Sequence, residues 1–226
     1  MSALVAILIP VLHRPWRVPL VLASITDATT EPHEVWFIGS PDEHAEREAV
    51  KAAGGAWMQV AVGRSRGDYA RKINLGLQTT STPYVFLGAD DLAFHPGWLE
   101  AALSKMGGKI GVVGTNDLGN QRVIAGEHAT HSLVSRKYAR QGTIDDKTKL
   151  LHEGYPHEFV DDEFVETARS RDAFAHAADS IVEHLHPHWG KAPSDHIYAA
   201  APERLRVGRR LYRERCSLWG GDPTSR

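Results

Sequence analysis

The chain has very little cysteine, no long apolar run near its start and almost no net charge. Cys216 is the only cysteine among 226 residues, which excludes an intrachain disulfide and a cluster of thiolate metal ligands. The apolar stretch at residues 4–9 is far too short to cross a bilayer, and nothing around it indicates a signal peptide. A formal charge of -2 gives no electrostatic basis for binding nucleic acid. We therefore expect a cytoplasmic protein with no transmembrane segment and no nucleic-acid partner.

The composition is that of an ordinary globular protein. Apolar residues make up 42% and charged residues 24% of the chain, and its length suits one large domain with an extension. Basic side chains are concentrated only near the end, where six arginines lie between residues 204 and 215. We expect one domain over residues 1–200 and an arginine-rich helical extension over residues 201–226, in which a solvated helix face is the usual meaning of such a run.

Apolar stretches of strand character alternate with segments of helical periodicity through the first half. Strands are expected at residues 4–11, 34–39, 57–62, 84–88 and 110–114. Helices are expected between them, near residues 18–25, 42–53, 69–77 and 96–106. This alternation predicts an α/β fold, with a mostly parallel sheet flanked by helices on both faces. Ligands of such sheets bind outside the carboxyl ends of the strands.

One apolar strand stops on two adjacent aspartates, Asp90 and Asp91. A buried strand that ends in carboxylates presents hard oxygen ligands to a divalent cation. This pattern favours a metal-assisted reaction on a phosphorylated ligand. The alternative is that the two aspartates only open a turn or cap the next helix.

The other strand exits supply candidate contacts for a phosphorylated cofactor. Arg64 and Arg66 follow Gly63 in one exit loop, and guanidinium groups suit phosphate oxygens. Two arginines in a surface loop are unremarkable by themselves. The candidate cofactor-binding residues are Pro10, Arg14, Ser40, Arg64, Arg66, Lys72 and Asp91.

The order of these features resembles a GT-A glycosyltransferase of the family 2 type over residues 3–200. Residues 70–76 are similar to the Ala-Arg-Asn-x-Gly segment that precedes the acidic motif in that family. The acidic motif itself is normally Asp-x-Asp. When the chain is aligned in this way, Gly88 stands in place of the first aspartate, and Asp90 matches the residue that binds the metal. The first aspartate contacts the nucleotide in that family, a role for which Asp91 is the substitute here.

A second acidic group, Asp161, Asp162 and Glu163, lies at an expected helix start. In inverting members of the family an acidic residue in this region takes the proton from the acceptor hydroxyl, which is general-base catalysis. Asp162 is the first candidate for the base, with Asp161 and Glu163 as close alternatives. The cluster could also serve only the helix dipole.

Three histidines, His184, His186 and His188, alternate with other residues near the end of the expected domain. In an extended segment their imidazoles would point the same way. The resemblance implies that His186 or His184 completes the metal site, and His186 is the preferred ligand. A separate zinc site made of all three, or plain surface positions, are open alternatives.

The resemblance implies an enzyme that transfers a sugar from a nucleoside diphosphate sugar to a hydroxyl acceptor. Mn²⁺ or Mg²⁺ would be required, and the anomeric carbon would be inverted. The acceptor is a hydroxyl on a glycan, a protein or a small molecule, and residues 115–144 are expected to shape its pocket. The arginine-rich arm could pair two copies in a homo-oligomer.

Two other functions fit the same residues. A sugar-1-phosphate nucleotidyltransferase shares the sheet and the metal, but such enzymes open with a glycine-rich loop after the first strand. Residues 10–15 contain no glycine. The second alternative is a non-catalytic module that binds a nucleotide sugar or a glycan.

Overall fold

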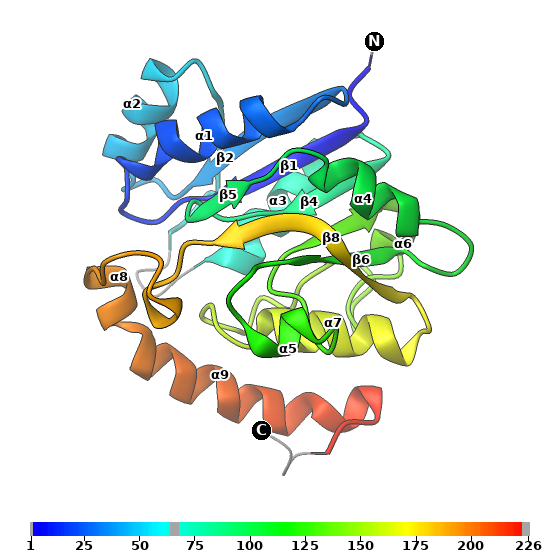
Figure 1. Ribbon diagram of the computed structural model, residues 1–226. Helices are drawn as coiled ribbons and strands as arrows, with labels where there is room; N and C mark the ends of the chain where they lie inside the picture. Colours follow the sequence, from blue (N-terminus) through cyan, green and yellow to red (C-terminus); the bar gives the residue numbers. More distant parts are fainter. Residues whose placement is uncertain (1, 64–67, 223–226) are drawn as a thin grey trace.

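A sheet of eight strands runs through the molecule, and helices cover both of its faces (Figure 1). The structure is a computed structural model that describes residues 2–63 and 68–222. The strand order is β3-β2-β1-β4-β7-β6-β8-β5. The strands are β1 (Val5–Pro10), β2 (His33–Gly39), β3 (Ala56–Gln59), β4 (Tyr84–Leu87), β5 (Leu92–Phe94), β6 (Val112–Asn116), β7 (Ser132–Ser135) and β8 (Phe174–His184).

Helices form most of the connections between the strands. Gly54, with a φ of 73°, ends one of them in a left-handed turn that leads the chain back to β3. The helices are α1 (Arg17–Ala28), α2 (His44–Ala52), α3 (Tyr69–Thr79), α4 (Trp98–Lys105), α5 (Gln121–Ile124), α6 (Arg136–Ala139), α7 (Val160–Ser170), α8 (His196–Ala199) and α9 (Ala201–Arg215), with 3-10 turns η1 (Pro187–Trp189) and η2 (Cys216–Trp219).

The directions of the strands bring many of their carboxyl ends to one edge of the sheet. β1 pairs in parallel with β2 and β4, and β2 pairs in parallel with β3. β7 is antiparallel to both β4 and β6, and β6 is parallel to β8, so β4, β6 and β8 run the same way. The predicted α/β class with a mostly parallel sheet is confirmed. The carboxyl ends of six strands therefore lie at the same edge of the sheet, where a ligand site is expected.

Alternate residues of β1 belong to two separate apolar cores. Ile7 and Ile9 pack with α1 and α4 on one face of the sheet. Ala6 and Leu8 pack with α3, α7 and the C-terminal segment on the other. Because side chains of a strand alternate between faces, the continuous apolar run at the start of the chain is explained by burial on both sides.

The structure differs from the predicted elements in two places. The third strand is shorter than residues 57–62, since β3 ends at Gln59. Residues 115–144, which show no helical period, contain α5, β7 and α6, each only four residues long. An element of four residues is too short to display a period, so the sequence pattern did not reveal it.

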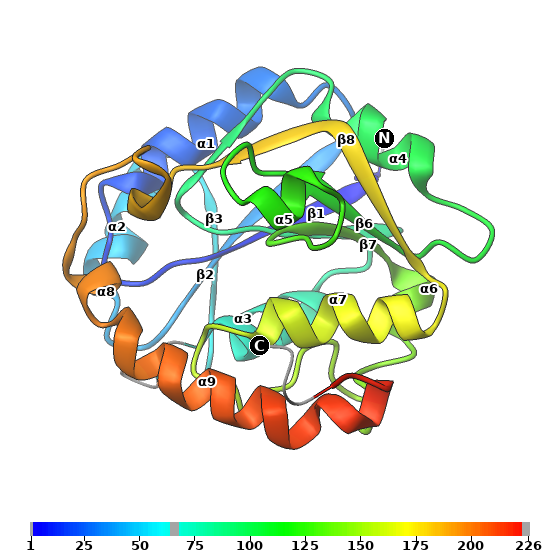
Figure 2. The ribbon, with the colours of Figure 1, turned by 60° about the horizontal axis from the view of Figure 1, so that its bottom comes forward.

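The C-terminal segment packs against the rest of the chain instead of projecting from it (Figure 2). Tyr212 and Trp219 belong to the same apolar core as α3 and α7. Arg215 donates to Glu163 on α7 at 2.8 Å and to Asp145 at 2.8 Å. A domain boundary at residue 200 stays a prediction, and the arginine-rich helix contributes directly to the core. In the described part of the chain, no helix is long and apolar enough to cross a membrane.

We expect Arg215→Met to lower the free energy of unfolding by about 3 kcal/mol, because Glu163 would remain buried without its cation. Glu163 is only 3% exposed. Chemical denaturation measures the change. Arg210 pairs with Glu214 at 3.6 Å on the surface, so Arg210→Met should stay within about 0.5 kcal/mol of the wild type. Equal stability of the two variants would show that the Arg215 ion pairs do not anchor the segment.

Candidate functional site

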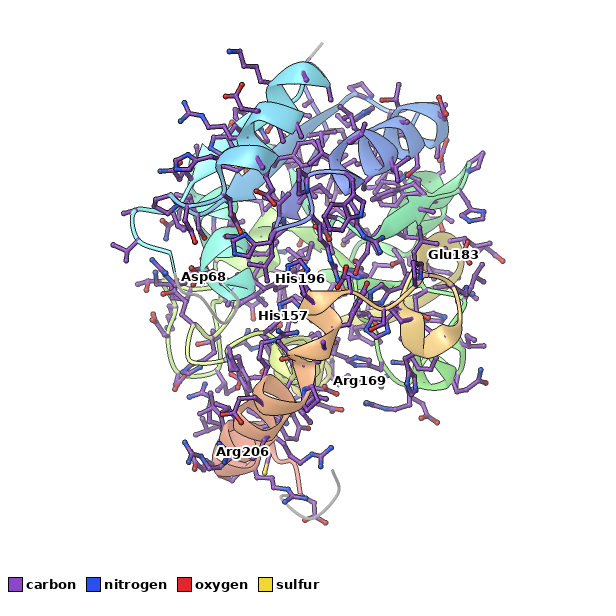
Figure 3. All side chains as sticks on the ribbon, turned by 90° about the vertical axis from the view of Figure 1, so that its left-hand side faces the viewer. Asp68, His157, Arg169, Glu183, His196 and Arg206 are labelled. Carbon is purple, nitrogen blue, oxygen red and sulfur yellow. The ribbon has the colours of Figure 1, made fainter. Side chains whose placement is uncertain are left out.

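A cavity of about 370 Å³ lies at the edge where the carboxyl ends of the strands meet. Figure 3 views this side of the molecule, with His157 and His196 labelled near the middle. Ser40 does not line the cavity, and Arg64 and Arg66 lie outside the described residues. The predicted site residues that do line it are Pro10, Arg14, Lys72, Asp90, Asp91, Asp161, Asp162, His184 and His186.

Lys72 is committed to a buried ion pair at the back of this cavity. Its ammonium donates to both carboxylate oxygens of Glu43, at 3.0 and 2.9 Å, and to the carbonyl oxygen of Val11 at 2.6 Å. Lys72 and Glu43 are each 1% exposed. Burial raises the pKa of Glu43, and Lys72 opposes that rise. Ser40 donates its backbone N–H to the same carboxylate, so the exits of β1 and β2 are joined through Glu43.

Asp90 and Asp91 follow β4 and share one guanidinium. Arg14 Nη1 lies 3.4 Å from Asp90 Oδ1 and 3.2 Å from Asp91 Oδ2, and all three side chains are buried. The second oxygen of Asp90, Oδ2, is buried with no hydrogen-bond partner among the described residues. Burial and the neighbouring Asp91 raise the pKa of Asp90 to about 7. The positive charge around Asp90 is therefore too small to offset its burial and the repulsion from Asp91.

Residues of the C-terminal part close over these carboxylates. The Tyr198 hydroxyl donates to Asp91 Oδ2 at 2.6 Å, and its ring stacks 4.1 Å from the Arg14 guanidinium. Asp195 accepts hydrogen bonds from Arg14 at 2.8 and 3.1 Å. Asp195 also caps α8 by accepting from the backbone N–H of Ile197. No motif in the sequence pointed to Asp195 or Tyr198, because their partner Arg14 lies more than 180 residues earlier in the chain.

His184 is the histidine that meets the aspartates. Its Nε2 lies 3.5 Å from Asp91 Oδ1, and this contact with Arg14 and Tyr198 holds the pKa of Asp91 well below its usual range despite burial. The His186 ring packs 5.0 Å from that of His184, and its Nδ1 accepts from the backbone N–H of His188. β8 ends at His184, so His188 lies in the following 3-10 turn. Among the described residues, close metal-ligand atoms are grouped at His128, Asp161 and Asp162 and not at these three histidines.

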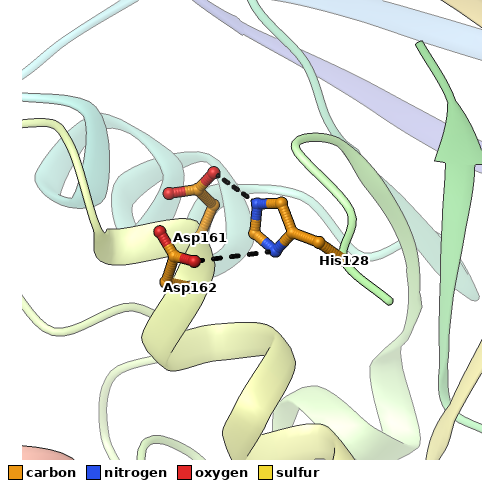
Figure 4. A group of neighbouring side chains, drawn as sticks. All are labelled: His128, Asp161 and Asp162. Carbon is orange, nitrogen blue, oxygen red and sulfur yellow. Dashed lines mark hydrogen bonds and ion pairs between the residues drawn. The ribbon is translucent and has the colours of Figure 1, made fainter. Parts of the chain in front are cut away.

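The second acidic group lies at the start of α7 and meets His128 (Figure 4). His128 Nε2 lies 3.1 Å from Asp161 Oδ2, and its Nδ1 lies 3.9 Å from Asp162 Oδ1. Arg122 donates to Asp162 Oδ1 at 3.1 Å. Burial would raise the pKa of Asp161, but the bond from His128 lowers it below its ordinary value. Glu163 turns away to Arg215 and Tyr155, so the structure separates it from the other two acids.

His128 and His131 belong to the stretch whose role the sequence did not reveal. Asp117 holds this stretch in place by accepting from Thr130 Oγ1 at 3.0 Å. His131 Nδ1 lies 3.0 Å from the Leu87 carbonyl oxygen, beside the end of β4. His128 contacts Asp161, and His131 packs against the ring of His184 beside Asp91. The close spacing of the two histidines was the one signal in the sequence that could have marked them.

Gly88, the position expected to align with the first aspartate of an Asp-x-Asp motif, has no room for a side chain. A Cβ at this position would lie 2.6 Å from Ile9 Cδ1 and 3.0 Å from the carbonyl oxygen of Leu8. A side chain would therefore collide with β1. The close approach of β4 to β1 leaves Asp90 and Asp91 as the acids of this strand end.

Solved structures resemble the whole chain, although no family model matches it and no curated protein matches it in sequence. Glucosyl-3-phosphoglycerate synthase from Mycobacterium tuberculosis, with Mn²⁺, UDP and glucosyl-3-phosphoglycerate, has a TM-score of 0.66 and 16% identity over 99% of this chain and 82% of that chain. The same synthase with Mn²⁺, UDP-glucose and phosphoglyceric acid has a TM-score of 0.66 and 15% identity, covering 99% and 81%. The chain has the GT-A fold.

A third complex of that synthase, with Mg²⁺ and UDP, has a TM-score of 0.65 and 15% identity, over 95% of this chain and 80% of that chain. These TM-scores establish the fold. Because the identities are low, the activity must be argued from the site. The 99% coverage in the first two comparisons means that the likeness continues beyond residue 200, into the arginine-rich helix.

We expect Lys72→Met to lower the free energy of unfolding by about 3–5 kcal/mol, because a buried Glu43 would lose its cation. The pKa of Glu43 is already raised by burial, so the lone carboxyl would take up a proton more readily. Stability should therefore fall as the pH rises and recover as it is lowered toward about 4, near the unfolded pKa of a glutamate.

Denaturant unfolding at several pH values measures this loss. The double variant Lys72→Met/Glu43→Gln removes both charges and should recover most of the stability. A single variant as stable as wild type at pH 8 would contradict the structural role of the pair.

Proposed function

We propose that this protein is a metal-dependent glycosyltransferase that transfers a sugar from a nucleoside diphosphate sugar to an acceptor hydroxyl. One observation carries the proposal: a single cavity holds two separate acidic groups, Asp90 and Asp91 on one side and Asp161 and Asp162 on the other. The first group suits a metal and a diphosphate, and the second suits a base. The synthase structures with UDP-glucose and Mn²⁺ support this reading.

The residues at the end of β4 fit a divalent cation. Asp91 and His184 lie 3.5 Å apart, and Asp90 Oδ2 is a buried oxygen without a described partner. Carboxylate oxygens with an imidazole nitrogen suit Mn²⁺, and carboxylate oxygens suit Mg²⁺. We propose Asp90, Asp91 and His184 as the ligands, with His186 beside them. The cation would stabilise the charge of the departing diphosphate.

Arg14 is the proposed contact for the donor phosphates. Its guanidinium already compensates Asp90 and Asp91, and its planar fork suits phosphate oxygens equally well. The Tyr198 hydroxyl occupies Asp91 Oδ2, so a cation that carries the donor diphosphate would bind Oδ1, beside His184, or share Oδ2 with this hydroxyl. The β1 exit at Pro10, fixed from behind by Lys72, would form the wall beside the nucleotide.

Asp161 or Asp162 is the proposed general base. Asp161 has the more exposed side chain, 28% against 13%, and Asp162 is also held by Arg122. These contacts favour Asp161, although Asp162 was the first candidate from the sequence. An ionised carboxylate that takes the proton from the acceptor hydroxyl allows a single displacement at the anomeric carbon, with inversion.

A donor screen tests the proposed reaction. We expect one nucleoside diphosphate sugar, with UDP-glucose the first to try, to release nucleoside diphosphate in the presence of Mn²⁺ and a hydroxyl acceptor. Phosphoglyceric acid and glycerol 3-phosphate are the first acceptors, since the similar synthase structures contain them. EDTA should abolish the release. Pyrophosphate as the product would indicate a nucleotidyltransferase, and binding without any product would indicate a non-catalytic module.

A pair of variants tests the base. Asp161→Asn should lower kcat by about 10²-fold or more with little change in donor affinity, because general-base assistance contributes about 10²–10⁴. Asp162→Asn keeps the shape of the site and should cost less. Single-turnover kinetics and donor binding measure both effects. The reverse order would assign the base to Asp162, and two unaffected variants would exclude this acidic group.

A further inference from the structure

His131 lines the cavity that holds the two acidic groups. Its ring lies 5.3 Å from that of His184, the histidine that meets Asp91. His128, three residues earlier, meets Asp161. The segment that carries both histidines therefore links the metal side of the cavity to the base side.

The hydrogen bonds of His131 determine where its proton is. The Leu87 carbonyl oxygen can only accept, so Nδ1 of His131 carries the proton and donates it over 3.0 Å. Nε2 is buried and has no hydrogen-bond partner among the described residues, and the side chain is 5% exposed in all. A second proton on Nε2 would be a buried donor without an acceptor, so the neutral ring with a bare Nε2 is favoured.

Nε2 is an unpaired nitrogen of a residue that lines the cavity, and a hydroxyl of a bound ligand would pair it. More than about 90% of buried polar groups in proteins are paired, so this lone pair is an exception that calls for a partner. A divalent cation is the less suitable partner, because the carboxylate oxygens of Asp90 and Asp91 are the harder ligands for Mg²⁺ or Mn²⁺.

The proposed reaction places a hydroxyl-bearing group over this nitrogen. With the diphosphate held by a cation at Asp91 and the acceptor hydroxyl at Asp161, the donor sugar would lie near His131, whose ring packs against His184 beside Asp91. We infer that His131 is a specificity-determining residue, whose Nε2 accepts a hydrogen bond from a hydroxyl of the donor sugar. The inference rests on the proposed function and adds the sugar contact to it.

The variant His131→Asn isolates this contact. The asparagine amide can still donate to Leu87, as Nδ1 does, but it carries nothing at the position of Nε2. We expect its affinity for UDP-glucose with Mn²⁺ to fall about tenfold, since an unpaired buried hydroxyl costs about that much. Its affinity for UDP with Mn²⁺ should stay unchanged, because UDP lacks the glucosyl group whose hydroxyl makes this bond. Isothermal titration calorimetry measures both.

The matched control is His176→Asn. His176 lies on β8, outside the cavity, and both of its ring nitrogens also lack partners among the described residues. It should bind UDP and UDP-glucose as the wild type does. Thermal unfolding of both variants, within a few degrees of the wild type, would show that the fold is retained.

Two results would overturn the inference while the proposed function stands. Equal weakening of UDP and UDP-glucose in His131→Asn would assign the residue to the metal or to the fold. Wild-type affinity for both ligands would leave Nε2 without a role in donor binding. A wild-type protein that binds none of the nucleoside diphosphate sugars of the donor screen would overturn the proposed function together with this inference.

Discussion

Two adjacent carboxylates at the end of a buried strand need positive charge beside them, and much of the site follows from this need. Asp90 and Asp91 are each 6% exposed, where mutual repulsion and burial both disfavour their charged forms. Arg14 from the first loop lies between them, and His184 from the last strand meets Asp91. Segments from both ends of the chain are thereby drawn to the end of β4.

The charges of Arg14 and Asp91 also explain why the C-terminal part closes over the cavity. Asp195 binds the far side of the Arg14 guanidinium, and Tyr198 stacks on it while donating to Asp91. A cation and a diphosphate at this place would satisfy the same groups with different partners. The segment around α8 is thus tied to the charge state of the site.

Buried ion pairs other than those of Asp90 and Asp91 stabilise the elements around the cavity. Lys72 and Glu43 join the exits of β1 and β2, and Arg215 fixes Glu163 on the helix that starts with Asp161 and Asp162. The sequence makes Glu163 a candidate base because it directly follows Asp161 and Asp162. A helical step of about 100° per residue turns it from the cavity toward α9, which sequence adjacency does not show.

The sequence by itself determined the α/β class, the acidic strand end and the acidic helix start, because strand and helix periods are local properties of the chain. It also placed His184 and His186 at the exit of one strand. Only the tertiary structure decided that Lys72 pairs with Glu43 and that His184 rather than His186 meets Asp91. It also decided that Tyr198 and His131 line the same cavity. These roles depend on contacts across many residues of chain, and packing decides which side chains meet there.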